Sequence, residues 1–100
     1  MICQISQESD HVLVVLAGRI YVEEATELRQ KILEYVDREQ SKFVIDMSQV
    51  EYIDSSGLGV LVAIQKKALQ CSGGVTIKGI KGIVKELFEL TRLTRVFEIV

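Results

Sequence analysis

The chain has no proline and no tryptophan, and it has only one histidine and two cysteines among its 100 residues. Without a proline-rich, glycine-rich or low-complexity linker, we expect one domain over residues 1–100. Cys3 and Cys71 cannot make a disulfide framework, and with His11 alone they lack the spacing of a metal site. These absences exclude a disulfide-stapled scaffold and a structural zinc domain, and we expect neither metal nor cofactor.

A large excess of charge and a long hydrophobic run are also missing. The 12 basic and 14 acidic residues give a net charge of -2, whereas nucleic-acid binders are usually basic, so we expect no nucleic-acid partner. The longest apolar runs, at 12–17 and 58–64, are far shorter than the ~20 residues that span a bilayer, so we expect no membrane association. No secretory signal opens the sequence, which together with the few cysteines predicts a cytoplasmic protein.

No residue arrangement typical of an enzyme is present. The single histidine, His11, stands beside a predicted turn, which indicates a surface residue and leaves a serine triad without support. The sequence contains no GxSxG elbow, P-loop or GxGxxG motif. The acidic group Glu23, Glu24 and Glu27 lies at a predicted helix start, where it forms either a solvated face or a docking face for a basic partner. We predict a protein that is not an enzyme and has no catalytic residues.

Hydrophobic periodicity predicts alternating strands and helices. Strands are expected at 1–6, 12–17, 42–47, 75–78 and 96–100, and helices at 23–37, from about 55 to 71, and at 81–90. Residues 48–53 are expected to connect a strand to the next helix, and Ile83 of the last helix is expected to face inward. The order β-β-α-β-α-β-α-β, with an antiparallel hairpin first, predicts an α/β fold with a mixed sheet and helices packed against it.

The most specific segment joins a predicted strand to a predicted helix and reads Asp54-Ser55-Ser56-Gly57-Leu58-Gly59. Its aspartate and two serines can each cap a helix, and a plain cap is one interpretation. However, two hydroxyls stand where one would suffice. Gly57 and Gly59 each destabilise a helix by up to ~1 kcal/mol relative to alanine, which favours a site where another chain approaches the backbone. A helix N-terminus also favours an added phosphate group.

This motif, with Val44-Ile45-Asp46-Met47 and Ile53 before it, resembles the STAS domain, in particular that of the bacterial anti-sigma-factor antagonists. Leu16-Ala17-Gly18-Arg19-Ile20 resembles the second strand of that family and its exit, and Lys85-Glu86-Leu87-Phe88 resembles its third helix. The resemblance covers nearly the whole chain. It implies a single STAS domain over 1–100, with a STAS-like mixed sheet and helices packed against it.

The resemblance implies a protein switch. In such antagonists a partner that is both anti-sigma factor and serine kinase phosphorylates the first serine after the aspartate, which is Ser55 here. The unphosphorylated form binds the anti-sigma factor and releases the sigma factor, and a metal-dependent serine phosphatase resets the switch. The chain would act as a monomer, and the partner-binding residues would be Asp54, Ser56, Gly57, Leu58, Gly59 and Tyr21. Leu58 is equally compatible with a place in the core.

The sequence departs from the family pattern at Tyr21. Many antagonists carry an aspartate at this point, where the run here is Gly18-Arg19-Ile20-Tyr21. Tyrosine is a poor helix cap, so we expect a hydrogen bond worth ~1 kcal/mol to be missing. The substitution also removes a negative charge near the expected interface, which leaves the identity of the partner open. Family members commonly carry one more helix after the last strand, for which these residues hold no segment.

Another function from a different class is a STAS docking module without a phosphorylation cycle, serving a transporter or a lipid-transport complex. The acceptor serine Ser55 favours the switch, because a pure docking module has no need of it. The regulated output is also open, since some antagonist-like proteins steer secretion or second-messenger enzymes in place of transcription.

Overall fold

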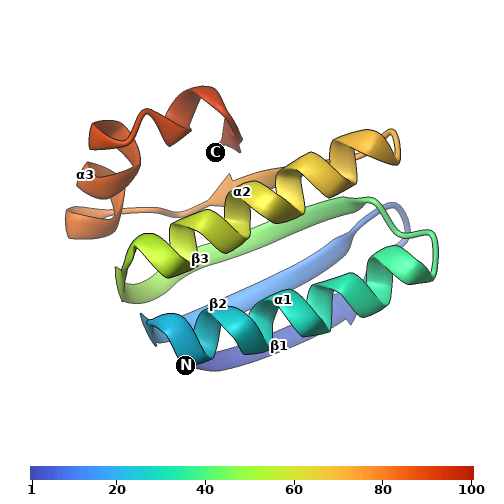
Figure 1. Cartoon of the computed structure of the whole chain (residues 1–100), viewed down its shortest axis with the longest axis horizontal. Helices are drawn as coiled ribbons and strands as arrows, with labels where there is room; N and C mark the ends of the chain where they lie inside the picture. Colours follow the sequence, from blue (N-terminus) through green and yellow to red (C-terminus); the bar gives the residue numbers. More distant parts are fainter.

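A computed structural model describes all residues from Met1 to Val100 (Figure 1). Strands β1 (Ile2–Gln7) and β2 (Val12–Ile20) form an antiparallel hairpin. The later elements are α1 (Val22–Asp37), β3 (Lys42–Ile53), α2 (Ser55–Gln70), β4 (Gly74–Lys78), α3 (Gly82–Leu90), the 3-10 turn η1 (Leu93–Arg95) and β5 (Glu98–Ile99). The strands lie in the order β1-β2-β3-β4-β5, and all pairs after the hairpin are parallel. The predicted α/β fold with a mixed sheet is confirmed.

The core lies between one face of the sheet and the two long helices. Figure 1 shows α1 and α2 side by side across this face. Along β2, Val12, Val14 and Leu16 point into the core and are fully buried. The alternate residues, such as Leu13 and Val15, are only half-buried on the opposite face. Burial on alternate strand positions therefore matches the period of two that predicted this strand.

One polar side chain, Gln65 of α2, is buried in this core. Its Oε1 accepts a hydrogen bond from the Val75 N–H at 2.7 Å, and its Nε2 donates to the Val96 carbonyl at 2.7 Å. Both ends of the amide are thus satisfied, as burial requires. Gln65, the polar interruption in the apolar face of α2, thus connects this helix to β4 and to the segment before β5.

The predicted end of the third strand at residue 47 is wrong, because β3 continues to Ile53. Its pairing with β2 shifts register twice, between Val15/Ala17 and between Gly18/Arg19. These irregularities make the buried positions Met47, Val50 and Ile53 recur every third residue in place of every second. Because these buried positions do not alternate, the period of two that predicts a strand is missing from residues 48–53.

Two smaller predictions at the C-terminal end also need correction. The last strand covers only Glu98–Ile99, not 96–100, because the N–H groups of Val96 and Phe97 donate back to the Leu93 carbonyl of η1 and keep these residues in a turn. Ile83 does not face inward but is 45% exposed, and the inward face of α3 is formed by Val84 and Phe88. Phe88 packs against Phe97, with ring centroids 6.1 Å apart.

The first register shift in β3 is supported by a side chain. A carboxylate oxygen of Asp46 accepts a hydrogen bond from the backbone N–H of Ser48 at 3.0 Å. This hydrogen bond satisfies a donor at the point where the extra residue interrupts the ladder. It is also the main reason why the pKa of Asp46 lies below its usual range, with Lys78 opposite on β4 adding a smaller effect.

We predict that Asp46→Asn destabilises the protein in a pH-dependent way. A lowered pKa in the folded state means that the carboxylate stabilises the fold above the ordinary aspartate pKa and loses this effect as pH falls through the folded value. The free energy of unfolding in urea should drop by up to about 1 kcal/mol at neutral pH, and the difference should shrink below about pH 4. Glu34→Gln removes an exposed carboxylate and serves as the control. If the loss of unfolding free energy in Asp46→Asn does not change with pH, the stabilising role assigned to the Asp46 carboxylate is wrong.

Candidate functional site

The Asp54–Gly59 motif lies at the carboxyl edge of the parallel strands, where α1, α2 and α3 begin (Figure 1). The Asp54 N–H donates a hydrogen bond to the carbonyl of Ile20 at 3.1 Å, and this joins the ends of β2 and β3. Tyr21 follows Ile20 directly and Ser55 follows Asp54 directly, so the starts of α1 and α2 lie next to each other. Carboxyl edges of parallel strands commonly carry binding sites, because successive loops meet there.

Asp54 is the residue that caps α2. Its carboxylate accepts a hydrogen bond from the Gly57 N–H at 3.1 Å, and its carbonyl accepts from Leu58 N–H at 3.0 Å. Ser55 and Ser56 therefore occupy the first helical turn, and neither hydroxyl is needed as a cap. The two hydroxyls differ in access, since Ser55 is exposed and Ser56 is half-buried.

The two glycines of the motif have different surroundings. A β-carbon on Gly57 would lie 2.5 Å from Ile53 Cγ1 and 3.0 Å from Ile20 Cγ2, so the core itself requires glycine there. A β-carbon on Gly59 would meet nothing within 4 Å, and Gly59 is exposed. Leu58 is 7% exposed and belongs to the core, which decides between its two interpretations. Another chain can thus approach the helix backbone closely at Gly59, while Gly57 and Leu58 face inward.

Tyr21 stands at the start of α1 without a capping hydrogen bond from its side chain, so the expected loss of a cap is confirmed. The Glu24 carboxylate compensates in part by accepting from the Tyr21 backbone N–H at 2.9 Å. The exposed Tyr21 ring lies against the ring of Tyr52, with centroids 6.0 Å apart and planes tilted by 46°. Tyr52 is absent from the predicted site because its position beside Arg19 depends on both register shifts in β3.

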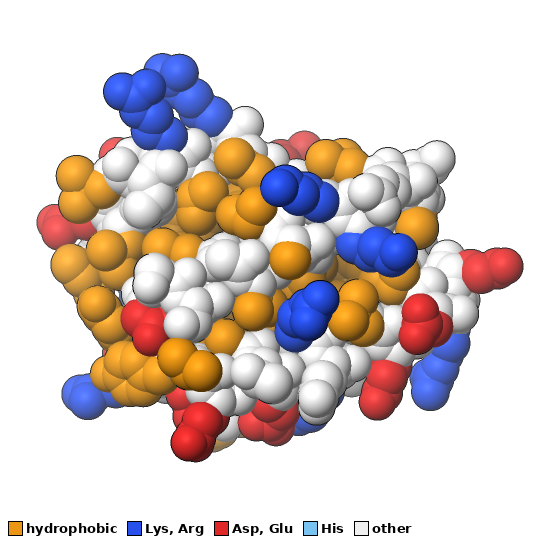
Figure 2. Space-filling view, in the orientation of Figure 1, with side chains coloured by type: hydrophobic (Ala, Val, Ile, Leu, Met, Phe, Trp, Pro, Cys, Tyr) orange, Lys and Arg blue, Asp and Glu red, His pale blue; other side chains and the backbone are white.

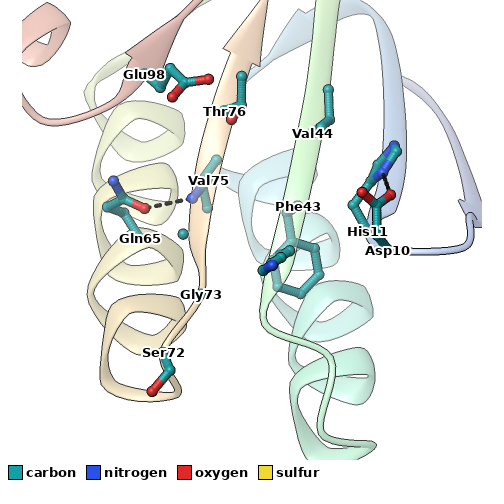
Figure 3. Close-up of a pocket in the computed structure, with 12 residues that line it drawn as sticks. Asp10, His11, Phe43, Val44, Gln65, Ser72, Gly73, Val75, Thr76 and Glu98 are labelled. Atoms are coloured by element: carbon teal, nitrogen blue, oxygen red, sulfur yellow. Dashed lines mark hydrogen bonds and ion pairs between the residues drawn. The ribbon is translucent and has the colours of Figure 1, made fainter.

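The pocket drawn in Figure 3 lies at the opposite edge of the sheet, where β2, β3 and β4 begin. It contains the predicted surface histidine, His11, whose Nδ1 lies 2.7 Å from a carboxylate oxygen of Asp10. This contact lowers the pKa of Asp10. Gln65 also lines the pocket, but both of its polar atoms are already engaged. None of the motif residues lines this pocket, so it is separate from the candidate site.

No group of three or more His, Cys, Asp or Glu side chains is placed to hold a metal ion. None of the helices combines the length and hydropathy that a membrane span requires. The acidic residues Glu23 and Glu24 lie in the first turn of α1, beside Tyr21. The site is therefore a surface of hydroxyl, aromatic and carboxylate groups at the starts of two helices.

Residues 3–100 match a family model described as "Mlab, STAS domain". The chain belongs to the STAS domain family. The anti-sigma-B factor antagonist of Listeria monocytogenes is 31% identical over 93 residues, which cover 93% of this STAS chain and 82% of the relative. The solved structure of an anti-sigma factor antagonist from Mycobacterium paratuberculosis is 26% identical, covers 98% of this chain and 83% of that one, and superposes with a TM-score of 0.86.

A more distant structure shares the fold alone. The phosphorylated form of the Bacillus cell fate determinant SpoIIAA is 15% identical, covers 99% of this chain and 91% of that chain, and has a TM-score of 0.80. The order of elements predicted from the sequence thus agrees with solved members of the family. The relatives carry the name anti-sigma factor antagonist, and this is the function to be tested at the site described above.

We predict opposite effects on stability for the two motif glycines. Gly57→Ala forces a methyl group against the buried side chains of Ile20 and Ile53, so we expect a loss of about 1–2 kcal/mol after the gain in helix propensity. Gly59→Ala adds a methyl group in open space and should stabilise α2 by up to about 1 kcal/mol. Urea denaturation of both variants measures these changes in the free energy of unfolding. Equal effects at the two positions would contradict the packing described here.

Proposed function

We propose that this STAS domain, taken as residues 1–100, is an anti-sigma-factor antagonist controlled by phosphorylation of Ser55. In this proposal the unphosphorylated form binds an anti-sigma factor that is also a serine kinase, and the sigma factor is released. Phosphorylation of Ser55 ends the binding, and a metal-dependent serine phosphatase restores it. The protein acts as a regulator in the cytoplasm, as a monomer, and is the substrate of an enzyme rather than an enzyme.

The observation that carries this proposal is the exposure of Ser55 in the first turn of α2. Of the two adjacent serines, Ser55 offers its hydroxyl to solvent while Ser56 is half-buried. Because Asp54 already caps the helix, phosphorylating Ser55 removes no hydrogen bond on which the fold depends. The names of the relatives support the antagonist function, and the position of Ser55 supports its role as acceptor.

The local charges explain how a phosphate could change binding without unfolding the domain. A phosphoserine carries about -1.5 to -2 charges at neutral pH. The neighbouring Asp54 repels it, while the first N–H groups of α2 and the helix dipole offset part of this repulsion. A binding surface built around a neutral hydroxyl then loses its complementarity to the partner, while the fold of the domain survives.

The remaining predicted contacts divide according to their access. Tyr21 and Gly59 are exposed, and Asp54 and Ser56 are half-buried beside Ser55, so we keep these four in the proposed binding surface. Gly57 and Leu58 are buried, and we assign them to the support of the surface rather than to contact with the partner.

We predict that incubation with ATP and the cognate anti-sigma factor kinase adds one phosphate, on Ser55. Intact mass and peptide mass spectrometry measure the modification, using each candidate anti-sigma factor kinase from the same genome. Ser55→Ala should abolish the modification. Ser56→Ala, the matched control one residue away, should leave it in place, because its hydroxyl is not the acceptor.

Binding of the same partners provides the second half of this test. The unphosphorylated protein should form a complex with the kinase, and the phosphorylated protein should lose at least about tenfold in affinity. A stable complex with no modification under any condition would instead favour the constitutive docking module. Absence of both binding and modification with every candidate would contradict the antagonist function.

A further inference from the structure

Two adjacent hydrophobic side chains stand exposed at the start of α1. Tyr21 is 42% exposed and Val22 is 59% exposed. Figure 2 shows hydrophobic side chains gathered at the left of the visible face, where α1 and α2 begin, with acidic side chains and, at the lower left, a basic side chain along their border. Exposed apolar groups that gather at one place on a surface, in contrast to scattered ones, mark sites of interaction.

The stability of the fold does not account for these two residues. A tyrosine at the N-cap position makes no capping hydrogen bond here, although serine, aspartate or asparagine would stabilise the helix. The β-branched Val22 has a lower helix propensity than alanine and gains little burial in return. Both residues therefore weaken the local structure compared with common alternatives, which points to a selective advantage outside the folded monomer.

The Tyr21 ring is also held in place before any partner arrives. It lies 6.0 Å from the Tyr52 ring, centroid to centroid, and Tyr52 is itself half-buried on β3. A large ring that is already supported loses little conformational entropy on binding, which is the property of aromatic hot spots in interfaces. The backbone of Tyr21 is likewise fixed by its hydrogen bond to Glu24.

The charges around the two side chains are mainly negative. Glu23 and Glu24 follow in the first turn of α1, and Asp54 begins α2 beside them. Glu51 is also near on β3, but Arg19 lies 3.5 Å from its carboxylate and partly neutralises it. A surface that matches this arrangement has an apolar centre and basic groups around it.

We propose that Tyr21 and Val22 form a hydrophobic anchor that fills an apolar pocket, rimmed by lysine or arginine, on the anti-sigma factor. The inference rests on the proposed function and describes the surface of its partner. The anchor adjoins Ser55 because the Asp54–Ile20 hydrogen bond brings the two helix starts together. The anchor holds the partner beside the acceptor serine, and its shape and charge determine which anti-sigma factor binds.

The test measures affinity of unphosphorylated variants for the anti-sigma factor kinase that modifies Ser55, by isothermal titration calorimetry. Tyr21→Ala should weaken binding by at least about 30-fold, as truncation of an interface hot spot does. Tyr21→Phe keeps the ring and should stay within about threefold of the unsubstituted protein. Leu69→Ala is the matched control, because Leu69 is 57% exposed at the other end of α2 and should not affect binding.

A second variant separates binding from folding. Tyr21→Asp supplies a good N-cap opposite Glu24, so its melting temperature should rise while its affinity falls at least about 30-fold. For the acidic border, Glu23→Gln should slow association several-fold at low salt, whereas Glu34→Gln, farther along α1, should leave the rate unchanged.

The outcomes distinguish the anchor from the function. If Tyr21→Ala or Tyr21→Asp binds as tightly as the unsubstituted protein, and Ser55 is still phosphorylated, the anchor is wrong and the antagonist function stands. If the unsubstituted protein neither binds nor is modified by any candidate kinase, the antagonist function fails and the anchor fails with it. Loss of affinity in both variants, with Tyr21→Phe and Leu69→Ala unaffected, supports the anchor.

Discussion

The hydrogen bond from the Asp54 N–H to the Ile20 carbonyl is the contact on which the site depends. It joins the ends of two parallel strands, and each strand continues directly into a helix. Residues 34 positions apart along the chain, Ile20 and Asp54, are thereby placed at one edge of the sheet. Gly57 allows this closeness, since any side chain there would strike Ile53 and Ile20. The starts of α1 and α2 are thus held by main-chain atoms and buried packing, independently of the exposed side chains around them.

The residues at this edge fall into two groups with opposite effects on stability. Asp54 and Gly57 favour the fold, one as a helix cap and the other by making room for the core. Tyr21 and Gly59 weaken their helices: Glu24 compensates only in part for the missing cap at Tyr21, and no packing contact compensates for Gly59. Such local conflicts are expected where a surface serves binding rather than folding. The same motif thus contains one glycine that the core requires and one that the packing of the monomer does not require.

The two irregularities in β3 determine how the site is presented. A regular strand would keep its buried positions at every second residue, whereas β3 shifts twice and buries Met47, Val50 and Ile53. The shifts place Tyr52 opposite Arg19 and beside the Tyr21 ring. Asp46 supports the first of them through the Ser48 N–H. Bulges of this kind redirect side chains at the end of a strand, and here they supply the support for an exposed aromatic group.

The sequence by itself determined the order of the strands and helices, the parallel arrangement after the first hairpin, and the place of the Asp54–Gly59 motif at a helix start. These features follow from local periodicity and capping preferences, which depend on residues near one another in the chain. The sequence could not show that Gly57 and Leu58 are buried while Gly59 is exposed. The burial of these residues depends on which side of α2 meets Ile20 and Ile53. Only the tertiary structure placed the Tyr52 ring against Tyr21 and left Ser55 more exposed than Ser56, since strand register and the packing of distant segments are not encoded in any local pattern.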